Sequence, residues 1–226
     1  MPHSSPVQTF PPVVQRQLLN SHEIRLMLGE LERTQRHSPK AILAGTGVSP
    51  RALANPAHRL TLAQELELYT RIAHRNTDPL LGIRVGRRLS LSSYGILGYA
   101  VMGAMTVAEA LAMLTEFSPL ISWASHHTLT RESYGGQDCR CLTLYPTAAD
   151  PRAAALEIES TLASLQTVFC ELTGDPVPFA AVEMVHHNPL VQGPEFRELF
   201  GCPINCGGER NALMLPEVLL SLSLIH

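Results

Sequence analysis

Apolar and polar residues follow two different periods along this chain, and the change falls just after Trp123. Before it, apolar residues recur every three or four positions, which is typical of amphipathic helices. Ser21–Arg36 has this pattern, and so does a segment from Thr61 to about Arg75. Thr61 and Gln64 have the spacing of a capping box, which marks a helix start. The pattern predicts that the first 120 residues are helical.

The longest nearly uncharged stretch is Ser92–Ala124, in which two glutamates are the only charged residues. A membrane-spanning helix needs about 20 uninterrupted apolar residues, whereas glycines and a second capping box, Thr106 with Glu109, divide this stretch. We therefore expect two consecutive buried helices, Gly95–Met102 and Val107–Leu120, and no membrane span.

After Trp123 the pattern becomes that of an α+β protein. His126–Glu132 and Cys139–Tyr145 flank a glycine-rich turn, which predicts a β-hairpin. Asp150 and Gly174 then bound a long helix with an apolar stripe between Ala155 and Leu172. The remaining segments predict strand, short helix, strand and strand, in the order Phe179–His186, Pro194–Phe200, Ile204–Cys206 and Asn211–Leu215.

These elements predict the fold class. We expect an α+β fold in which a helical N-terminal half packs on a mostly antiparallel sheet with a long crossing helix. Residues 1–20, rich in proline and serine, are interpreted as a flexible lead-in. Residues 21–226 are interpreted as one domain, because no linker separates the helical half from the strands.

Composition excludes some classes of function and indicates a cellular compartment. The chain has a formal charge of −3 and a pI near 6.4, which argues against binding of a polyanion by this chain. The N-terminus lacks the pattern of a secretory signal. Five cysteines without a disulfide-like spacing favour a reducing cytoplasm.

Candidate chemistry is sparse. The pairs His126–His127 and His186–His187 and the spacing of the cysteines do not match known zinc-site patterns, so no metal and no cofactor are expected. Cys170 or Cys202 beside a histidine would suggest a nucleophile, but a cysteine on an apolar helix face is usually inert packing. Phosphate-loop, dinucleotide and serine-hydrolase motifs are absent.

Several segments carry a family resemblance through their order and spacing. They are ILAGTGVSPRALANP, DPLLGIRVG, YGILGYAVMGAMTVAEAL and HHNPLVQGPEFRELFGCPINCGGERNALMLPEVLL. From about Glu23 onward the chain resembles the N-terminal regulatory domain, often labelled arabinose-binding-like, of AraC/XylS-type transcription regulators.

The resemblance implies a bacterial domain that senses a small-molecule effector and forms a homodimer. DNA binding would come only through a C-terminal domain with two helix-turn-helix motifs, which this chain lacks. A pure dimerisation module is an alternative, and a small-molecule enzyme using Cys or His is another. The family supplies no shared ligand motif.

Residue chemistry alone therefore suggests the binding site. We expect a pocket between the helices of residues 94–123 and the sheet, because such pockets are mainly apolar and aromatic with a few polar groups. The expected lining is Tyr94, Tyr99, Met102 and Trp123, with His126 or His186 as polar partners. The alternative is that these residues fill the core.

Overall fold

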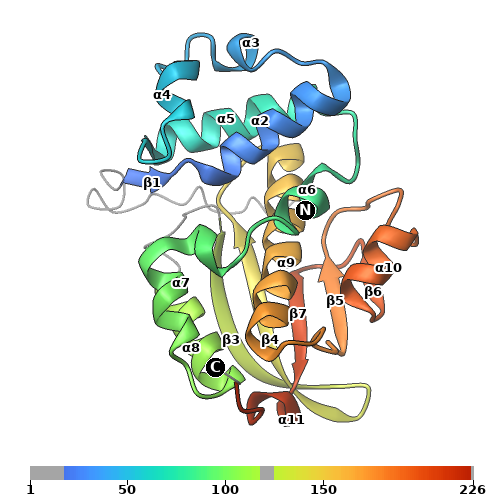
Figure 1. Cartoon of the computed structure of the whole chain (residues 1–226). Coiled ribbons are helices and arrows are strands. Elements are labelled where there is room, and N and C mark those ends of the chain that lie inside the picture. Colours follow the sequence, from blue (N-terminus) through green and yellow to red (C-terminus); the bar gives the residue numbers. More distant parts are fainter. Residues whose placement is uncertain (1–17, 118–124, 225–226) are drawn as a thin grey trace.

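The computed structural model describes residues 18–117 and 125–224. Figure 1 shows two layers: short helices form one layer, and a five-stranded sheet crossed by a long helix forms the other. The first layer contains β1 (Leu18–Asn20), α2 (His22–Gln35), α3 (Pro39–Leu43), α4 (Pro50–Ala54), β2 (Arg59–Thr61) and α5 (Leu62–Arg75). The connecting and flanking elements are α6 (Leu81–Gly86), η1 (Leu91–Tyr94), α7 (Gly95–Met102) and α8 (Val107–Phe117).

The second layer is built around α9 (Pro151–Thr173), which runs across one face of the sheet (Figure 1). Its strands are β3 (Ser125–Tyr134), β4 (Gln137–Pro146), β5 (Ala181–Met184), β6 (Ile204–Cys206) and β7 (Asn211–Pro216). Two short helices, α10 (Pro194–Phe200) and α11 (Glu217–Leu220), complete it. The strand order is β3-β4-β7-β5-β6, and only the β5–β6 pair is parallel. The predicted α+β class and the mostly antiparallel sheet are confirmed.

Local capping signals set several boundaries at the predicted places. Thr61 and Gln64 form a complete capping box at the start of α5. The Asp150 carboxylate accepts hydrogen bonds from the backbone N–H groups of Arg152 and Ala153 at the start of α9. Gly174 ends α9 in the left-handed conformation, which glycine adopts at little cost.

Three expectations need correction. The first 120 residues are not all helical, because β1 pairs with β2 in an antiparallel ladder from Leu18–Thr61 to Asn20–Arg59. Residues 18–20 therefore belong to the folded part, and the rest of the expected lead-in lies outside the described residues. Helix α7 is not buried all round, since the side chains of Ile96 and Tyr99 are 83% and 70% exposed.

The two layers are joined by a close contact between α6 and α9. Gly86 on α6 lies directly against α9, where a Cβ atom would come within 2.3 Å of the Ser160 carbonyl oxygen and 2.6 Å of Ala163 Cβ. Gly82, one turn earlier, lies equally close to the Glu159 side chain. These two glycines allow the backbones to approach.

We expect Gly86→Ala to lower the free energy of unfolding by about 1–3 kcal/mol, because the added methyl group forces the two backbones apart. Urea denaturation measures the change. Gly29→Ala in α2 is the matched control: nothing lies within 4 Å of the position that a Cβ atom would take there, and alanine in a helix should be neutral or stabilising by up to about 1 kcal/mol. Equal effects of the two substitutions would contradict the close contact between α6 and α9.

Candidate functional site

A cavity lies where the helical layer meets α8, the hairpin and α9. It contains about 910 Å³ of space between protein atoms, counting its open mouth. It is lined by Asn20, His22, Glu23, Glu65, Leu89, Ser93, Tyr94, Leu111, Leu114, Thr115, His127, Leu142, Thr161, Ser164, Leu165 and Val168. Both layers and the segments that connect them thus contribute to one site.

The wall of the cavity on the sheet side is mostly apolar. Leu111 and Leu114 come from α8 and Leu142 comes from β4, and each has its side chain largely buried. Helix α9 presents Thr161, Ser164, Leu165 and Val168, which lie on one face because helical residues three, four and seven apart are neighbours. This wall suits the apolar part of a ligand.

Two carboxyl groups, Glu23 from α2 and Glu65 from α5, line the side formed by the helical layer. Ser160 Oγ donates a hydrogen bond to Glu23. Burial raises the pKa of Glu23, and burial together with the nearby Glu23 raises the pKa of Glu65 to about 8. Glu65 thus favours its protonated form near neutral pH, and the pKa of Glu23 is shifted in the same direction.

The acidic group extends behind the cavity to Glu157 and Tyr69. Glu157, only 1% exposed, accepts hydrogen bonds from the backbone N–H groups of Thr147 at 2.7 Å and Ala148 at 3.0 Å. Burial raises its pKa well above the usual value, and the carboxyls of Glu65 and Glu23 add to the shift. Burial likewise raises the pKa of the Tyr69 hydroxyl.

Tyr94 is the expected site residue that the structure places in the cavity. It ends η1, and its hydroxyl is hydrogen-bonded to Ser164 Oγ on α9. Asn20 Nδ2 donates to the backbone carbonyl of the adjacent Ser93 at 3.2 Å. These contacts attach η1 to both α9 and β1 at the rim of the cavity.

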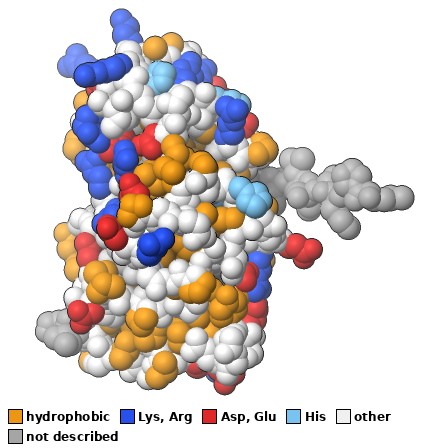
Figure 2. Space-filling model, turned by 90° about the vertical axis from the view of Figure 1, so that its right-hand side faces the viewer, with side chains coloured by type: hydrophobic (Ala, Val, Ile, Leu, Met, Phe, Trp, Pro, Cys, Tyr) orange, Lys and Arg blue, Asp and Glu red, His pale blue; other side chains and the backbone are white. Residues whose placement is uncertain are grey.

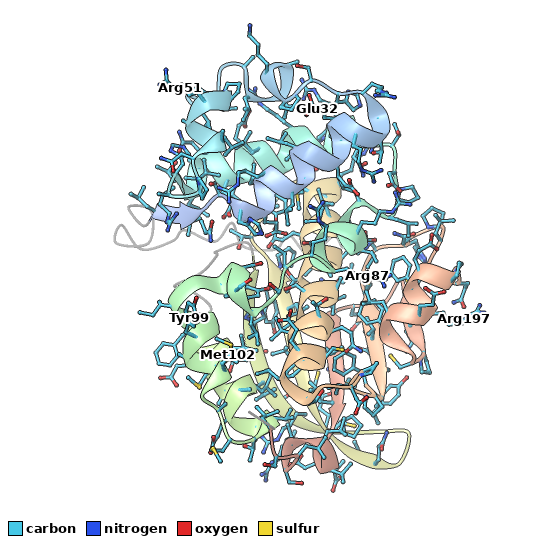
Figure 3. All side chains as sticks on the ribbon, in the orientation of Figure 1. Glu32, Arg51, Arg87, Tyr99, Met102 and Arg197 are labelled. Atoms are coloured by element: carbon cyan, nitrogen blue, oxygen red, sulfur yellow. The ribbon has the colours of Figure 1, made fainter. Side chains whose placement is uncertain are left out.

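Two of the other expected lining residues lie on the exposed side of α7. Tyr99 and Met102 on α7 are 70% and 38% exposed and do not line the cavity; Figure 3 labels both on a helix at the edge of the molecule. Trp123 lies outside the described residues. The backbone of His126 lies on β3 opposite Tyr145, and its side chain is not among those described. The lining residues include its neighbour His127.

His186 is part of a separate network that joins the layers. Its Nε2 lies 2.9 Å from Glu159 Oε1, and Asn188 Nδ2 donates to the same oxygen at 2.7 Å and to the carbonyl of Pro79 at 2.6 Å. Glu159 is only 5% exposed. This histidine therefore pairs with a buried carboxylate on α9, and it is not among the residues that line the cavity.

The sequence contains a signal for Glu65 that periodicity alone does not use. The buried face of α5 is formed by Leu62, Leu68, Tyr69 and Ile72, and Glu65 lies on the same face. A charged residue within an apolar helix face is rarely buried without a reason. The Asp and Glu residues of a first helical turn are, however, usually interpreted as partners of the helix dipole. With that interpretation Glu65 is not recognised as a buried residue.

The alternative of a Cys or His enzyme gains no support from the described residues. Burial raises the pKa of the Cys202 thiol to about 11, which disfavours the reactive thiolate. All five cysteines are free. Among the residues described, no three His, Cys, Asp or Glu side chains are grouped so that they could hold a metal ion. In the same part of the chain, no helix is both long and apolar enough to cross a membrane.

Residues 37–224 match the arabinose-binding N-terminal domain of AraC transcription regulators. The chain belongs to this family. It is 26% identical over 164 residues to the ornithine utilization regulator of Pseudomonas aeruginosa, covering 73% of this chain and 47% of that protein. An uncharacterized HTH-type transcriptional regulator of Mycobacterium tuberculosis is 33% identical over 80 residues, which are 35% of this chain and 23% of that protein.

The fold comparison agrees with the family. The crystal structure of the transcriptional regulator CdpR from Pseudomonas aeruginosa superimposes with a TM-score of 0.62 at 21% identity, over 89% of this chain and 57% of that one. This AraC-type domain thus spans about half the length of the ornithine utilization regulator, the first of these relatives. The sequence-based recognition of the family is confirmed, and the known relatives are transcription regulators.

Proposed function

We propose that this domain senses a small-molecule effector in the cavity and transmits its occupancy to a DNA-binding domain of the same regulator. The observation that carries the proposal is the cavity itself, which combines an apolar wall with the carboxyls of Glu23 and Glu65 at the junction of two layers. Small-molecule sites typically have this combination of apolar lining and few polar groups.

The position of the cavity suits a sensor. An effector there would contact α2 and α5 of the helical layer, the flanking helix α8 and α9 of the sheet layer at the same time. A ligand shifts a conformational equilibrium only by its difference in affinity for the two states. A site shared by two layers supplies such a difference whenever the layers move relative to each other, and we propose that this movement is the signal.

The relatives support a nitrogenous metabolite as one effector class. One of them is named a regulator of ornithine utilization, and ornithine carries a side-chain amine. The two cavity carboxyls provide groups that such an amine can pair with. We propose that this chain acts in the cytoplasm, where its free cysteines remain reduced.

A cavity-filling substitution tests the proposal. Thr161→Phe places a ring into the cavity from α9, so compounds that raise the thermal unfolding midpoint of the unmodified domain should have no effect on the variant. The panel should contain amines, organic acids, sugars and aromatic metabolites. Val168→Phe serves as a second filled variant if Thr161→Phe folds poorly. Compounds that stabilise the filled variants equally well would contradict binding in this cavity.

We also propose self-association as a two-fold dimer, through the apolar face formed by α7, α8 and α11. The long helix α9 offers little surface for such contacts, because most of its residues are buried. Large exposed apolar side chains instead lie on or beside the three other elements: Ile96, Tyr99, Met105, Val218 and Leu222. Backbone hydrogen bonds between Met105 and Leu224 and between Val107 and Leu222 make this face continuous.

Ile96→Glu should raise the dimer dissociation constant at least about tenfold, because it places a charge in an apolar interface. Sedimentation velocity across a concentration series measures this. Val185→Glu changes another exposed apolar residue, 47% exposed on the β5 side, and should leave association unchanged. A monomer at all concentrations in the unmodified domain, or equal effects of the two substitutions, would contradict this interface.

A further inference from the structure

The position of Glu65 suggests the chemical class of the effector. Its side chain lines the cavity, only 2% of its surface is exposed, and Oε2 has no hydrogen-bond partner among the described residues. A buried polar group without a partner is costly, and native proteins rarely keep one. A donor on a bound ligand would remove that cost.

Glu23 adds a second carboxyl to the same part of the cavity. Within the described part of the chain, no hydrogen bond or ion pair connects Glu23 or Glu65 to a basic side chain, and Glu23 accepts its hydrogen bond from the neutral hydroxyl of Ser160. The titratable groups around them are Glu157 on α9, Tyr69 on α5 and Tyr94 on η1. The other titratable lining groups are the imidazoles of His22 and His127, with Arg25 and Arg88 close to His22. Among the residues that the structure describes, the two carboxyls thus have no basic side chain bound to them.

The helical layer that contributes Glu23 and Glu65 is otherwise rich in basic residues. Residues 21–90 contain eleven Lys and Arg against six Asp and Glu, whereas residues 91–226 contain five against fourteen. Figure 2 shows Lys and Arg side chains gathered over the upper layer of the face in view. Surface charge would therefore draw anions to the helical layer, but inside the cavity the groups that this layer contributes include two glutamates.

We infer that the effector is an organic ammonium ion with an apolar body, whose charged nitrogen lies between the carboxyls of Glu65 and Glu23. The apolar wall of Leu111, Leu114 and Val168 receives the body. The hydroxyl groups of Tyr94 and Ser164, which are hydrogen-bonded to each other, also line the cavity and provide polar contacts for the ligand. This inference rests on the proposed function.

Binding of the ammonium ion is coupled to the release of a proton from Glu65. In the empty cavity Glu65, with a pKa of about 8, holds a proton at neutral pH. An ammonium ion stabilises the carboxylate, so it binds as the cation and the carboxyl proton leaves to solvent. The affinity therefore rises with pH up to about 8. It falls again only where the amine itself loses its proton, near the ordinary pKa of a primary amine, about 10.4.

The experiment uses simple probes of equal length: 1,5-diaminopentane, pentylamine, 1-pentanol and pentanoate, each at up to about 10 mM, where weak ligands bind. Calorimetric titration in buffers of different ionisation enthalpy measures affinity and proton release. The proteins are the unmodified domain, Glu65→Gln and Glu67→Gln. Glu67 is the matched control, because it lies on the same helix but is half exposed and paired with Arg71 at 2.6 Å.

We expect the two amines to bind and to release up to about one proton near pH 7. Glu65→Gln should weaken their binding by about 10- to 100-fold, as expected for loss of a charged hydrogen bond, and Glu67→Gln should not. Absence of amine binding, or equal binding to Glu65→Gln, would overturn the inference. Binding of pentanol or pentanoate alone, abolished by Thr161→Phe, would overturn it while leaving the proposed function in place.

Discussion

Replacing Glu65 with glutamine should stabilise the empty domain at pH 8–9 and leave its stability near pH 4.5 almost unchanged. The folded-state pKa of Glu65 is raised from its ordinary value of 4.5 to about 8, mainly by burial. Between these values the folded state binds more protons than the unfolded state, so the free energy of unfolding falls as the pH rises. The loss is complete above about pH 8 and amounts to at most about 5 kcal/mol.

Urea denaturation from pH 4.5 to 9 measures this effect. The variant should have a flatter profile, because glutamine cannot ionise, and Glu67→Gln should follow the unmodified domain. Carboxyls whose pKa is lowered, such as Asp150 and Glu132, lose their contribution only below the unfolded pKa, so they do not affect this window. A profile for Glu65→Gln that is parallel to that of the unmodified domain would show that Glu65 ionises freely.

Replacing Glu157 with leucine should cost about 2–5 kcal/mol of unfolding free energy. The carboxyl accepts hydrogen bonds from two backbone N–H groups, those of Thr147 and Ala148, between β4 and α9. Leucine leaves both donors buried without a partner, and each such group costs about 1–3 kcal/mol. Glu157→Gln retains one acceptor oxygen and should lose roughly half as much.

Thermal and urea unfolding of both variants test whether stability falls from the unmodified domain to Glu157→Gln and then to Glu157→Leu. The result follows from the connection between the hairpin and α9, so it does not depend on any ligand. If Glu157→Leu were as stable as the unmodified domain, or less damaging than Glu157→Gln, then the carboxyl would not be the acceptor that holds this connection.

The sequence predicts the parts of the fold that depend on local chemistry. The capping box of Thr61 and Gln64 and the ends of α9 at Asp150 and Gly174 act within a few residues, so their spacing is enough to place them. The β1–β2 ladder escapes prediction because each strand has three residues and its partner lies about 40 positions away.

The site is harder to predict because, like the β1–β2 ladder, it is formed by residues that lie far apart in the sequence. Helix α7 is apolar on nearly all sides, so periodicity does not show which face is buried, and the inward placement expected for Tyr99 and Met102 is wrong because both are exposed. Tyr94 ends η1 beside α9 and lines the cavity, and its contact with a ligand stays a prediction. Glu23 and Glu65 come from different helices, and the packing of α2 on α5 brings them to one cavity.

The most direct test of the account is a crystal structure of the domain with the compound from the thermal panel that stabilises it most. We predict that the compound lies in the cavity between α2, α5, α8 and α9, in contact with Ser164 and with its cationic group within hydrogen-bond distance of Glu65 Oε2. A compound bound elsewhere, with the cavity unchanged and Glu65 without a contact, would contradict the account.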